Sequence, residues 1–204
     1  IPLAIEVPLR DGRKVGVVHA EVLELNSWAG IEDYSVGGEE AAEAGTFKGT
    51  QLLWGRARVA KALKVRSCPD AAGCSLLLRS RAMELLEPVP GIDLVVAGHT
   101  PLEPKVPLQC ANMLWIDTGA GYEEGRLTFV DLVADEYTQF SHGRKRYRRS
   151  KLPPPVSLDH WKLSPEQQLL ANAERAAQDE QNNKVLAMFG LRPPDRGGPG
   201  GYNS

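Results

Sequence analysis

Two short apolar runs, each ending in a histidine, are the feature that most restricts how this chain can fold. The first run is Val15-Gly16-Val17-Val18-His19, and the second is Leu94-Val95-Val96-Ala97-Gly98-His99. Continuous apolar runs of this length are typical of strands that are buried on both faces, as in sheets flanked by helices. We therefore expect an α/β fold in which His19 and His99 each stand at the C-terminal end of a strand.

The position of the two histidines has a chemical meaning. Ligands of such sheets bind beyond the carboxyl ends of the strands. Imidazole is a good ligand for zinc, iron and manganese-type centres. Taken alone, the residues leave two interpretations open: a metal site, or two strand-end histidines with structural partners.

The rest of the pattern predicts further elements. Asp11-Gly12 separates two β-branched stretches and indicates a hairpin. Ser164, Pro165 and Gln167 form a capping-box signature at the start of a long helix that ends before Gly190. The predicted helices cover residues 47–63, 75–86 and 164–189, and the predicted strands cover 3–9, 14–20, 92–97, 114–117 and 126–132.

The character of the chain changes after residue 134. Residues 135–163 are expected to be a basic and proline-rich linker, 164–190 a C-terminal helix, and 191–204 a disordered tail. Within the linker, the basic segment from Arg144 to Lys151 could contact an acidic partner or nucleic acid, with Tyr147 stacking on a base, or it could be a solvated spacer. The helix is expected to dock on its own domain, or to bind a partner through Leu169, Leu170, Ala173 and Ala177.

Cysteine content and hydropathy bear on the compartment. The three cysteines are an odd number, which argues against a pure disulfide framework. We expect reduced thiols in a cytoplasmic protein; the alternative is a disulfide between Cys68 and Cys74 across their turn-like loop. No apolar run approaches 18 residues, so no membrane contact is expected, and the formal net charge of -2 gives no global field for nucleic acid.

Four motifs occur in a fixed order: VGVVHAE, LLWGR, DLVVAGHTP and WIDTGAGYEEGRLTFVDL. In this order they resemble the second half of the calcineurin-like metallophosphoesterases, and most closely the bacterial and phage-type serine/threonine phosphoprotein phosphatases. The resemblance spans residues 1–134. It implies a four-layer αββα sandwich, of which residues 1–134 would be the C-terminal half, followed by a helical extension.

The resemblance also implies roles for particular residues. His19 and His99 would bind the second of two divalent ions, with Mn²⁺ expected and iron or zinc as alternatives. Arg56, from the W-x-R motif, would bind the substrate phosphate, because a guanidinium offers a planar fork of donors; the alternative is a residue on a solvated helix face. Trp28 and Trp54 are expected to be packing residues, and Thr100, Asp117 and Thr118 to be scaffold.

The implied activity is metal-dependent hydrolysis of a phosphoprotein or a small phosphoester. The family's three earlier motifs, D-x-H, G-D-x-x-D-R-G and G-N-H-E, do not occur in the eighteen residues before His19. We therefore expect a truncated chain with no catalytic general acid of its own, inactive alone. Two alternatives remain: a dinucleoside polyphosphate hydrolase, and a non-catalytic interaction module.

Overall fold

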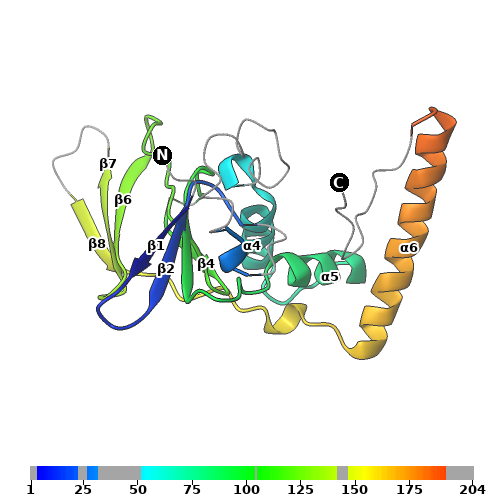
Figure 1. Cartoon of the computed structure of the whole chain (residues 1–204), viewed down its shortest axis with the longest axis horizontal. Coiled ribbons are helices and arrows are strands. Elements are labelled where there is room, and N and C mark those ends of the chain that lie inside the picture. Colours follow the sequence, from blue (N-terminus) through cyan, green and yellow to red (C-terminus); the bar gives the residue numbers. More distant parts are fainter. Residues whose placement is uncertain (1–3, 23–26, 32–51, 104, 142–146, 192–204) are drawn as a thin grey trace.

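The fold of the chain combines a mixed β-sheet, a smaller antiparallel sheet and helices, so it belongs to the α/β class. The computed structural model describes residues 4–22, 27–31, 52–103, 105–141 and 147–191. Figure 1 shows the smaller sheet on the left, the mixed sheet in the middle and the helices on the right. The expectation of a disordered tail falls on residues 192–204, outside the described residues, and only residue 191 of that segment is described.

The mixed sheet has five strands in the order β1-β2-β3-β5-β4. β2, β3 and β5 run parallel in its centre, while β1 and β4 are antiparallel edge strands. The predicted hairpin is confirmed as β1 and β2, and Gly12 supplies the positive φ that its turn requires. The five strands of the mixed sheet are β1 (Ala4–Pro8), β2 (Lys14–Val18), β3 (Leu94–Ala97), β4 (Leu108–Cys110) and β5 (Met113–Trp115).

The second sheet consists of β6 (Arg126–Asp131), β7 (Glu136–Ser141) and β8 (Tyr147–Lys151), all antiparallel. β7 and β8 lie in the segment that we expected to be a linker, so that expectation was wrong for these residues. The reason is that the inward-facing alternation of β7 is short and includes a polar residue, while β8 is mostly charged. Tyr137 and Gln139 are buried, and Gln139 donates to the carbonyl of Lys105 at 2.8 Å.

Two hydrophobic cores lie on opposite faces of the mixed sheet. Val95 and Ala97 of β3 belong to the larger core, which packs against the helices, while Leu94 and Val96 belong to the smaller core. The smaller core also receives Val130, which lies in β6. The helices and the small sheet therefore cover opposite faces of the mixed sheet, and β3 is buried on both sides, as predicted.

One close approach in the larger core depends on a glycine. The indole of Trp28 is buried against Gly16, and a Cβ on Gly16 would lie 2.1 Å from the Trp28 ring. The prediction that Trp28 is a packing residue is confirmed.

Three α-helices and a 3₁₀ turn have defined bounds: α4 (Ala57–Ser67), α5 (Leu76–Leu85), η1 (Asp159–Trp161) and α6 (Pro165–Met188). α5 and α6 confirm two of the predicted helices, and Ser164 and Gln167 form the predicted capping box. Residues 47–51 of the helix predicted over 47–63 lie outside the described residues. In the remainder, a helical turn at 52–54 is separated from α4 by Gly55 and Arg56, and α4 continues to Ser67. No helix in the described ranges is long and apolar enough to cross a bilayer.

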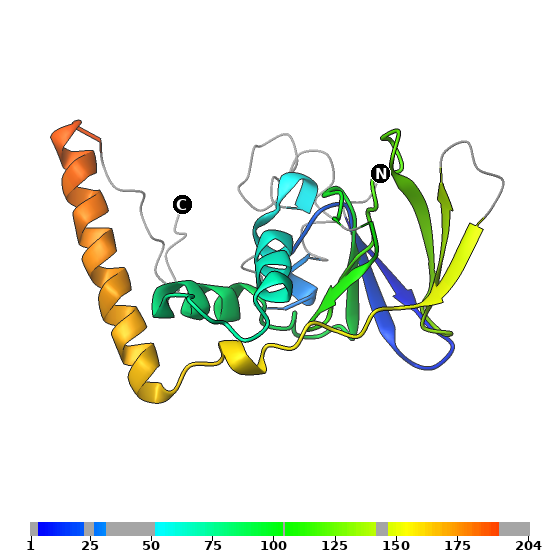
Figure 2. The ribbon, with the colours of Figure 1, turned by 180° about the vertical axis from the view of Figure 1, so that it is seen from behind.

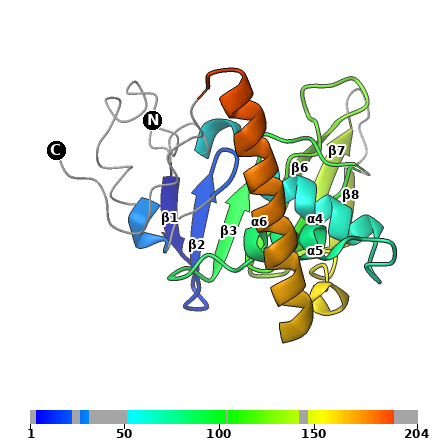
Figure 3. The same cartoon turned by 90° about the vertical axis from the view of Figure 1, so that its right-hand side faces the viewer.

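The C-terminal extension follows the body of the molecule before it forms α6 (Figure 2). Val156 forms a bridge with the edge strand β4, and the buried indole of Trp161 donates to the carbonyl of Cys68 at 2.9 Å. α6 lies against α5, as Figure 3 shows. Ala171 is buried in this contact and Arg175 pairs with Glu84 at 2.8 Å.

The predicted docking of the C-terminal helix on its own domain is thus confirmed. It does not use the apolar residues proposed for partner binding, since Leu169, Leu170, Ala173 and Ala177 are all exposed.

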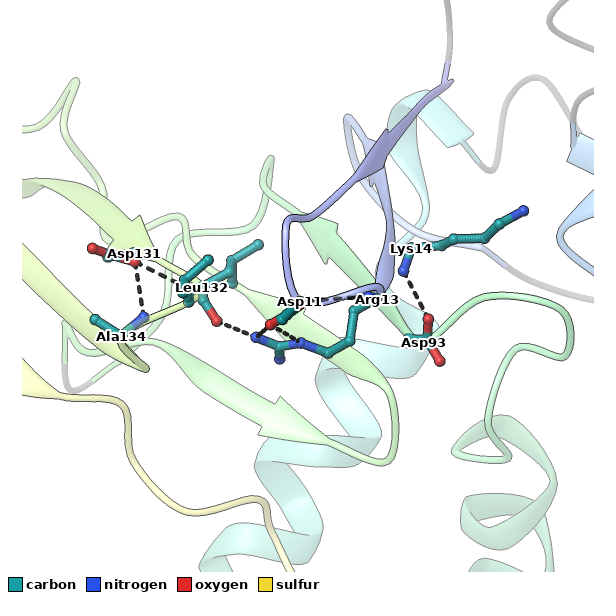
Figure 4. Close-up of polar contacts among 8 residues, drawn as sticks. Asp11, Arg13, Lys14, Asp93, Asp131, Leu132 and Ala134 are labelled. Atoms are coloured by element: carbon teal, nitrogen blue, oxygen red, sulfur yellow. Dashed lines mark hydrogen bonds and ion pairs between the residues drawn. The ribbon is translucent and has the colours of Figure 1, made fainter.

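Polar contacts at the lower end of the hairpin hold the two sheets in place (Figure 4). The guanidinium of Arg13 donates to the carbonyl of Leu132 in the turn after β6. The backbone N–H of Lys14 donates to the carboxylate of Asp93 at 2.7 Å, and the backbone N–H of Asp93 donates to the carbonyl of Lys14 at 3.1 Å. These bonds lock the start of β2 beside the start of β3, so the two strands also end beside each other.

Candidate functional site

His19 and His99 lie together at the C-terminal edge of the mixed sheet. β2 and β3 are parallel neighbours, with Val18 opposite Ala97, and each histidine follows its strand within two residues. The Nε2 atom of His19 is 3.0 Å from the Nδ1 atom of His99, and the ring centroids are 4.9 Å apart. The two histidines therefore converge, as two ligands of one ion must, although 79 residues lie between them in the chain.

A backbone bond and a sharp turn set this alignment. The N–H of Gly98 donates to the carbonyl of His19 at 2.9 Å, which continues the pairing of β2 and β3 by one step. His99 then takes a left-handed conformation with φ of 66°, and Thr100 N–H donates to the Gly98 carbonyl at 2.8 Å. Non-glycine residues with positive φ are uncommon and cluster at functional sites. The turn directs the His99 ring to His19.

Arg56 also reaches this edge. Its Nη2 atom lies 3.4 Å from the Nε2 atom of His99, on the side of the ring away from His19. Arg56 is the N-cap residue of α4 and is exposed, so its guanidinium is accessible to a ligand. Arg58, two residues later, does not lie on a solvated helix face: it is only 6% exposed and donates to the carbonyls of Val22 and Glu87.

Trp54 is a further member that sequence reasoning placed wrongly. It was expected to be a packing residue, yet it is 64% exposed. Its ring meets His99 edge-on, with centroids 5.1 Å apart and an angle of 86° between the planes. An exposed indole at this distance forms one wall of the site.

Glu21 is a buried residue that sequence reasoning missed. Its carboxylate accepts the backbone N–H groups of Ala57 and Arg58, each at 2.8 Å. These are orphan donors of the first turn of α4, and a carboxylate there is also favoured by the helix dipole. Glu21 follows His19 by two residues, so one short segment carries a site histidine and fixes the helix start from which Arg56 projects.

The surroundings shift the protonation of two of these groups. Loss of hydration, together with the facing His19 and Arg56, lowers the pKa of His99, so its ring is neutral at pH 7. A neutral imidazole is the form that can ligate a metal ion or accept a proton. Burial raises the pKa of Glu21, and the backbone N–H groups that it accepts oppose that rise.

The geometry of the two ring nitrogens fits two ligands of one ion. Two nitrogens, each about 2.0–2.1 Å from a shared ion and separated by an angle between the octahedral and the tetrahedral value, stand about 2.8–3.4 Å apart. The observed 3.0 Å lies within this range. No group of three or more His, Cys, Asp or Glu side chains suited to a metal ion occurs in the described part of the chain. The described residues thus offer a pair of suitably spaced nitrogens, and a metal site would need further ligands.

The residues expected to be scaffold make structural contacts. Asp117 accepts the N–H of Gly119 at 2.8 Å, and the buried Thr118 donates to the Arg126 carbonyl at 2.6 Å. Both contacts fix the loop between β5 and β6, as their predicted role requires.

The described part of the basic segment, residues 147–151, forms β8 of the small sheet. Residues 144–146 are outside the described residues. Arg149 and Lys151 both pair with Glu136, and Lys151 does so at 3.3 Å. The two contacts lower the pKa of Glu136, and that with Lys151 has the larger effect. Contact with an acidic partner stays a prediction.

Comparison with known proteins adds no assignment. No protein-family model matches the sequence, and no curated protein matches it. The resemblance to the metallophosphoesterases therefore rests on the motifs, and the case for a function rests on the geometry above.

Proposed function

We propose that this chain supplies two metal-ligating histidines and a phosphate-binding arginine to a metal-dependent phosphoester hydrolase that acts on serine/threonine phosphoproteins. The observation that carries the proposal is the 3.0 Å approach of His19 Nε2 to His99 Nδ1, with the Arg56 guanidinium 3.4 Å from the same His99 ring. A nitrogen pair beside an accessible guanidinium is suited to a cation and a bound anion.

The proposal assigns a separate task to each residue. His19 and His99 hold one divalent ion, Mn²⁺ in our expectation, through the facing nitrogens. When bound, a pair of such ions supplies Lewis acidity and a water of lowered pKa. Arg56 binds the non-bridging phosphate oxygens and stabilises the charge that develops on them. Trp54 limits the approach to the ring of His99.

The proposed fold is the four-layer αββα sandwich. The described residues form three layers: the helices, the mixed sheet and the small sheet. The outer face of the small sheet carries Leu127, Phe129 and Phe140, each between 41% and 57% exposed, and Phe129 meets Phe140 edge-on at 5.8 Å. Exposed apolar side chains in a row are typical of a face that another element covers. This face supports a fourth layer, and the segment that forms it is a candidate source of the remaining ligands.

The test compares this 204-residue chain with the complete reading frame that contains it. Both proteins are supplied with Mn²⁺ and assayed on p-nitrophenyl phosphate, on phosphoserine and phosphothreonine peptides, and on a dinucleoside tetraphosphate. The proposal expects chelator-sensitive release of phosphate from the phosphopeptides by the complete protein, and little turnover by this chain alone.

The substrate profile separates the alternatives. Preference for the dinucleoside tetraphosphate would favour the dinucleoside polyphosphate hydrolase. Absence of turnover on every substrate, with Mn²⁺ bound or not, would favour the interaction module. Robust chelator-sensitive turnover by the 204-residue chain would contradict the expectation that this chain is inactive alone.

A further inference from the structure

Two cysteines at the junction of α4 and α5 lie in contact. The Sγ atoms of Cys68 and Cys74 are 3.8 Å apart, and both side chains are half-buried. They flank a five-residue loop. The third cysteine, Cys110, differs from them in that its side chain is buried, with 1% exposure. Closing a disulfide requires the sulfur atoms to approach to about 2.05 Å. Rotation of the two short side chains can cover much of that change.

The backbone of the loop is folded so that it returns on itself. Ala71 N–H donates to the carbonyl of Cys68 at 3.0 Å, and Cys74 N–H donates to the carbonyl of Ala71 at 3.1 Å. Ala71 and Gly73 both have positive φ, which these consecutive turns require. The loop therefore brings Cys74 back to Cys68 by local structure.

Both ends of the loop are fixed to the rest of the molecule. Cys68 is the C-cap residue of α4, and Ser75 is the N-cap of α5, where its hydroxyl accepts the N–H of Leu78 at 3.2 Å. The carbonyl of Cys68 also accepts the indole N–H of Trp161. A cross-link between Cys68 and Cys74 would join the end of one helix to the start of the next.

We propose that Cys68 and Cys74 form a reversible dithiol–disulfide site that low-molecular-weight disulfides, such as oxidised glutathione, convert to an intrachain disulfide. One cysteine thiolate attacks a sulfur of the small disulfide, which forms a mixed disulfide and releases one thiolate. The second cysteine thiolate then attacks the protein sulfur of the mixed disulfide and releases the other. The protein loses two thiol protons and two electrons, and the small disulfide gains them as two thiols.

The surroundings of Cys68 affect the rate of this exchange. Burial, the Cys74 thiol and the nearby Asp70 raise the pKa of Cys68. Its thiolate is therefore scarce at neutral pH, and the exchange should be faster in mildly alkaline buffer. The reduced thiols expected from the sequence and the proposed disulfide are two states of one site.

The experiment uses the full 204-residue chain. Reduced protein is equilibrated with excess oxidised glutathione, quenched in denaturant with a thiol-alkylating reagent and measured by mass spectrometry. The alkylated thiols should fall from three to one, and an excess of dithiothreitol should restore three. The tryptic peptide 67–79, which contains both cysteines, should be about 2 Da lighter than its reduced form. Cleavage before Asp70 should leave its two pieces joined.

Two sets of variants make the result specific. Cys110→Ala should keep the loss of two thiols, falling from two to none. Cys68→Ser and Cys74→Ser should form no internal bond and should end as mixed disulfides with glutathione or as free thiols. The proposal is wrong if the wild-type chain keeps three thiols, if Cys110 takes part in the bond, or if oxidation links two chains instead. The wild-type peptide map decides this even if a serine variant does not fold.

Discussion

Glu21 and Arg58 meet through the backbone: the buried carboxylate of Glu21 accepts the N–H of Arg58 at 2.8 Å, at the first turn of α4. The same carboxylate accepts the N–H of Ala57. Glu21 therefore joins the segment after β2, which carries His19, to the first turn of α4, which follows Arg56. Glu21 is fully buried and does not reach the site itself, but a change at Glu21 should alter the positions of Arg56 and His99.

Replacing this carboxylate should destabilise the protein. Glu21→Ala leaves two N–H groups of the first turn without their acceptor and should lower the free energy of unfolding by about 1–3 kcal/mol. Glu21→Gln keeps one acceptor oxygen and should cost less. Urea unfolding monitored by circular dichroism measures both, with the exposed Glu123→Ala as the matched control. Equal stability of all three variants would show that the cap contributes nothing.

Arg56 should matter for catalysis and leave folding unchanged. In the complete enzyme, Arg56→Ala should lower kcat/KM by about 2–4 kcal/mol of transition-state stabilisation, because one donor to the developing charge is lost. Arg56→Lys should fall between, since a lysine keeps the charge and loses the planar fork. Metal content should not change. Arg81→Ala, an exposed arginine on α5, is the control. Unaltered kinetics in Arg56→Ala would mean that Arg56 does not bind phosphate.

The two histidines should share one metal ion. His19→Ala and His99→Ala should each lower the affinity for Mn²⁺ at least tenfold, about 1.4 kcal/mol, and the double variant should be no more than slightly worse than either. Calorimetric titration with Mn²⁺ measures the affinities. His160→Ala, an exposed histidine in η1, serves as the control. If the two single changes are additive and small, the histidines do not bind one ion together.

Cys110 should make stability fall in alkaline solution. Burial raises the pKa of Cys110 from its ordinary value of 9.0 to about 11. Between these two values the unfolded chain loses the thiol proton and the folded chain keeps it, so the unfolded state is favoured as pH rises. The free energy of unfolding should fall by about 2–3 kcal/mol across that pH interval on account of Cys110, and it should not change on this account below the interval. Unfolding free energies from pH 8 to about pH 11 should show a smaller decline for Cys110→Ala than for the wild type. Parallel curves would contradict the prediction.

The contact of Trp28 with Gly16 should not tolerate a methyl group. A Cβ on Gly16 would stand 2.1 Å from the indole, so Gly16→Ala must displace the ring or the strand, at a cost of about 1–3 kcal/mol. Gly121→Ala, where a Cβ meets nothing within 4 Å, is the control. Thermal unfolding separates them, and an unchanged Tm for Gly16→Ala would mean that the ring moves freely.

The parts of the fold that could be predicted are those in which local pattern and tertiary structure agree. β3 reads as a fully apolar run because both of its faces are buried, and α6 announces its start through Ser164, Pro165 and Gln167. His19 and His99 could be placed because each ends such a run. Their convergence was predicted because the resemblance assigns both to one ion, and the structure achieves it through the parallel pairing of β2 and β3.

The missed residues are those whose role depends on distant parts of the chain. Glu21 reads as an ordinary surface carboxylate, and only the position of α4, 36 residues later, makes it a buried cap. Trp54 is apolar by composition, yet the turn before α4 exposes it next to His99. β7 was missed because its buried residues are only Tyr137 and Gln139, and β8 was missed because Arg148, Arg149 and Lys151 dominate its sequence.

Contacts in the first half of α6 join it to α5. These contacts include Gln168, Ala171 and Arg175, whereas Val185, Met188 and Phe189, at the far end, are exposed. A helix of 24 residues is about 36 Å long, and about 20 Å of it extends beyond Arg175. A tilt of about 10° at the anchored end would carry the tip about 3–4 Å, several times the displacement near Ala171. A small change in the packing of α6 against α5 would therefore displace the exposed apolar residues at the C-terminal end of the helix by a larger distance.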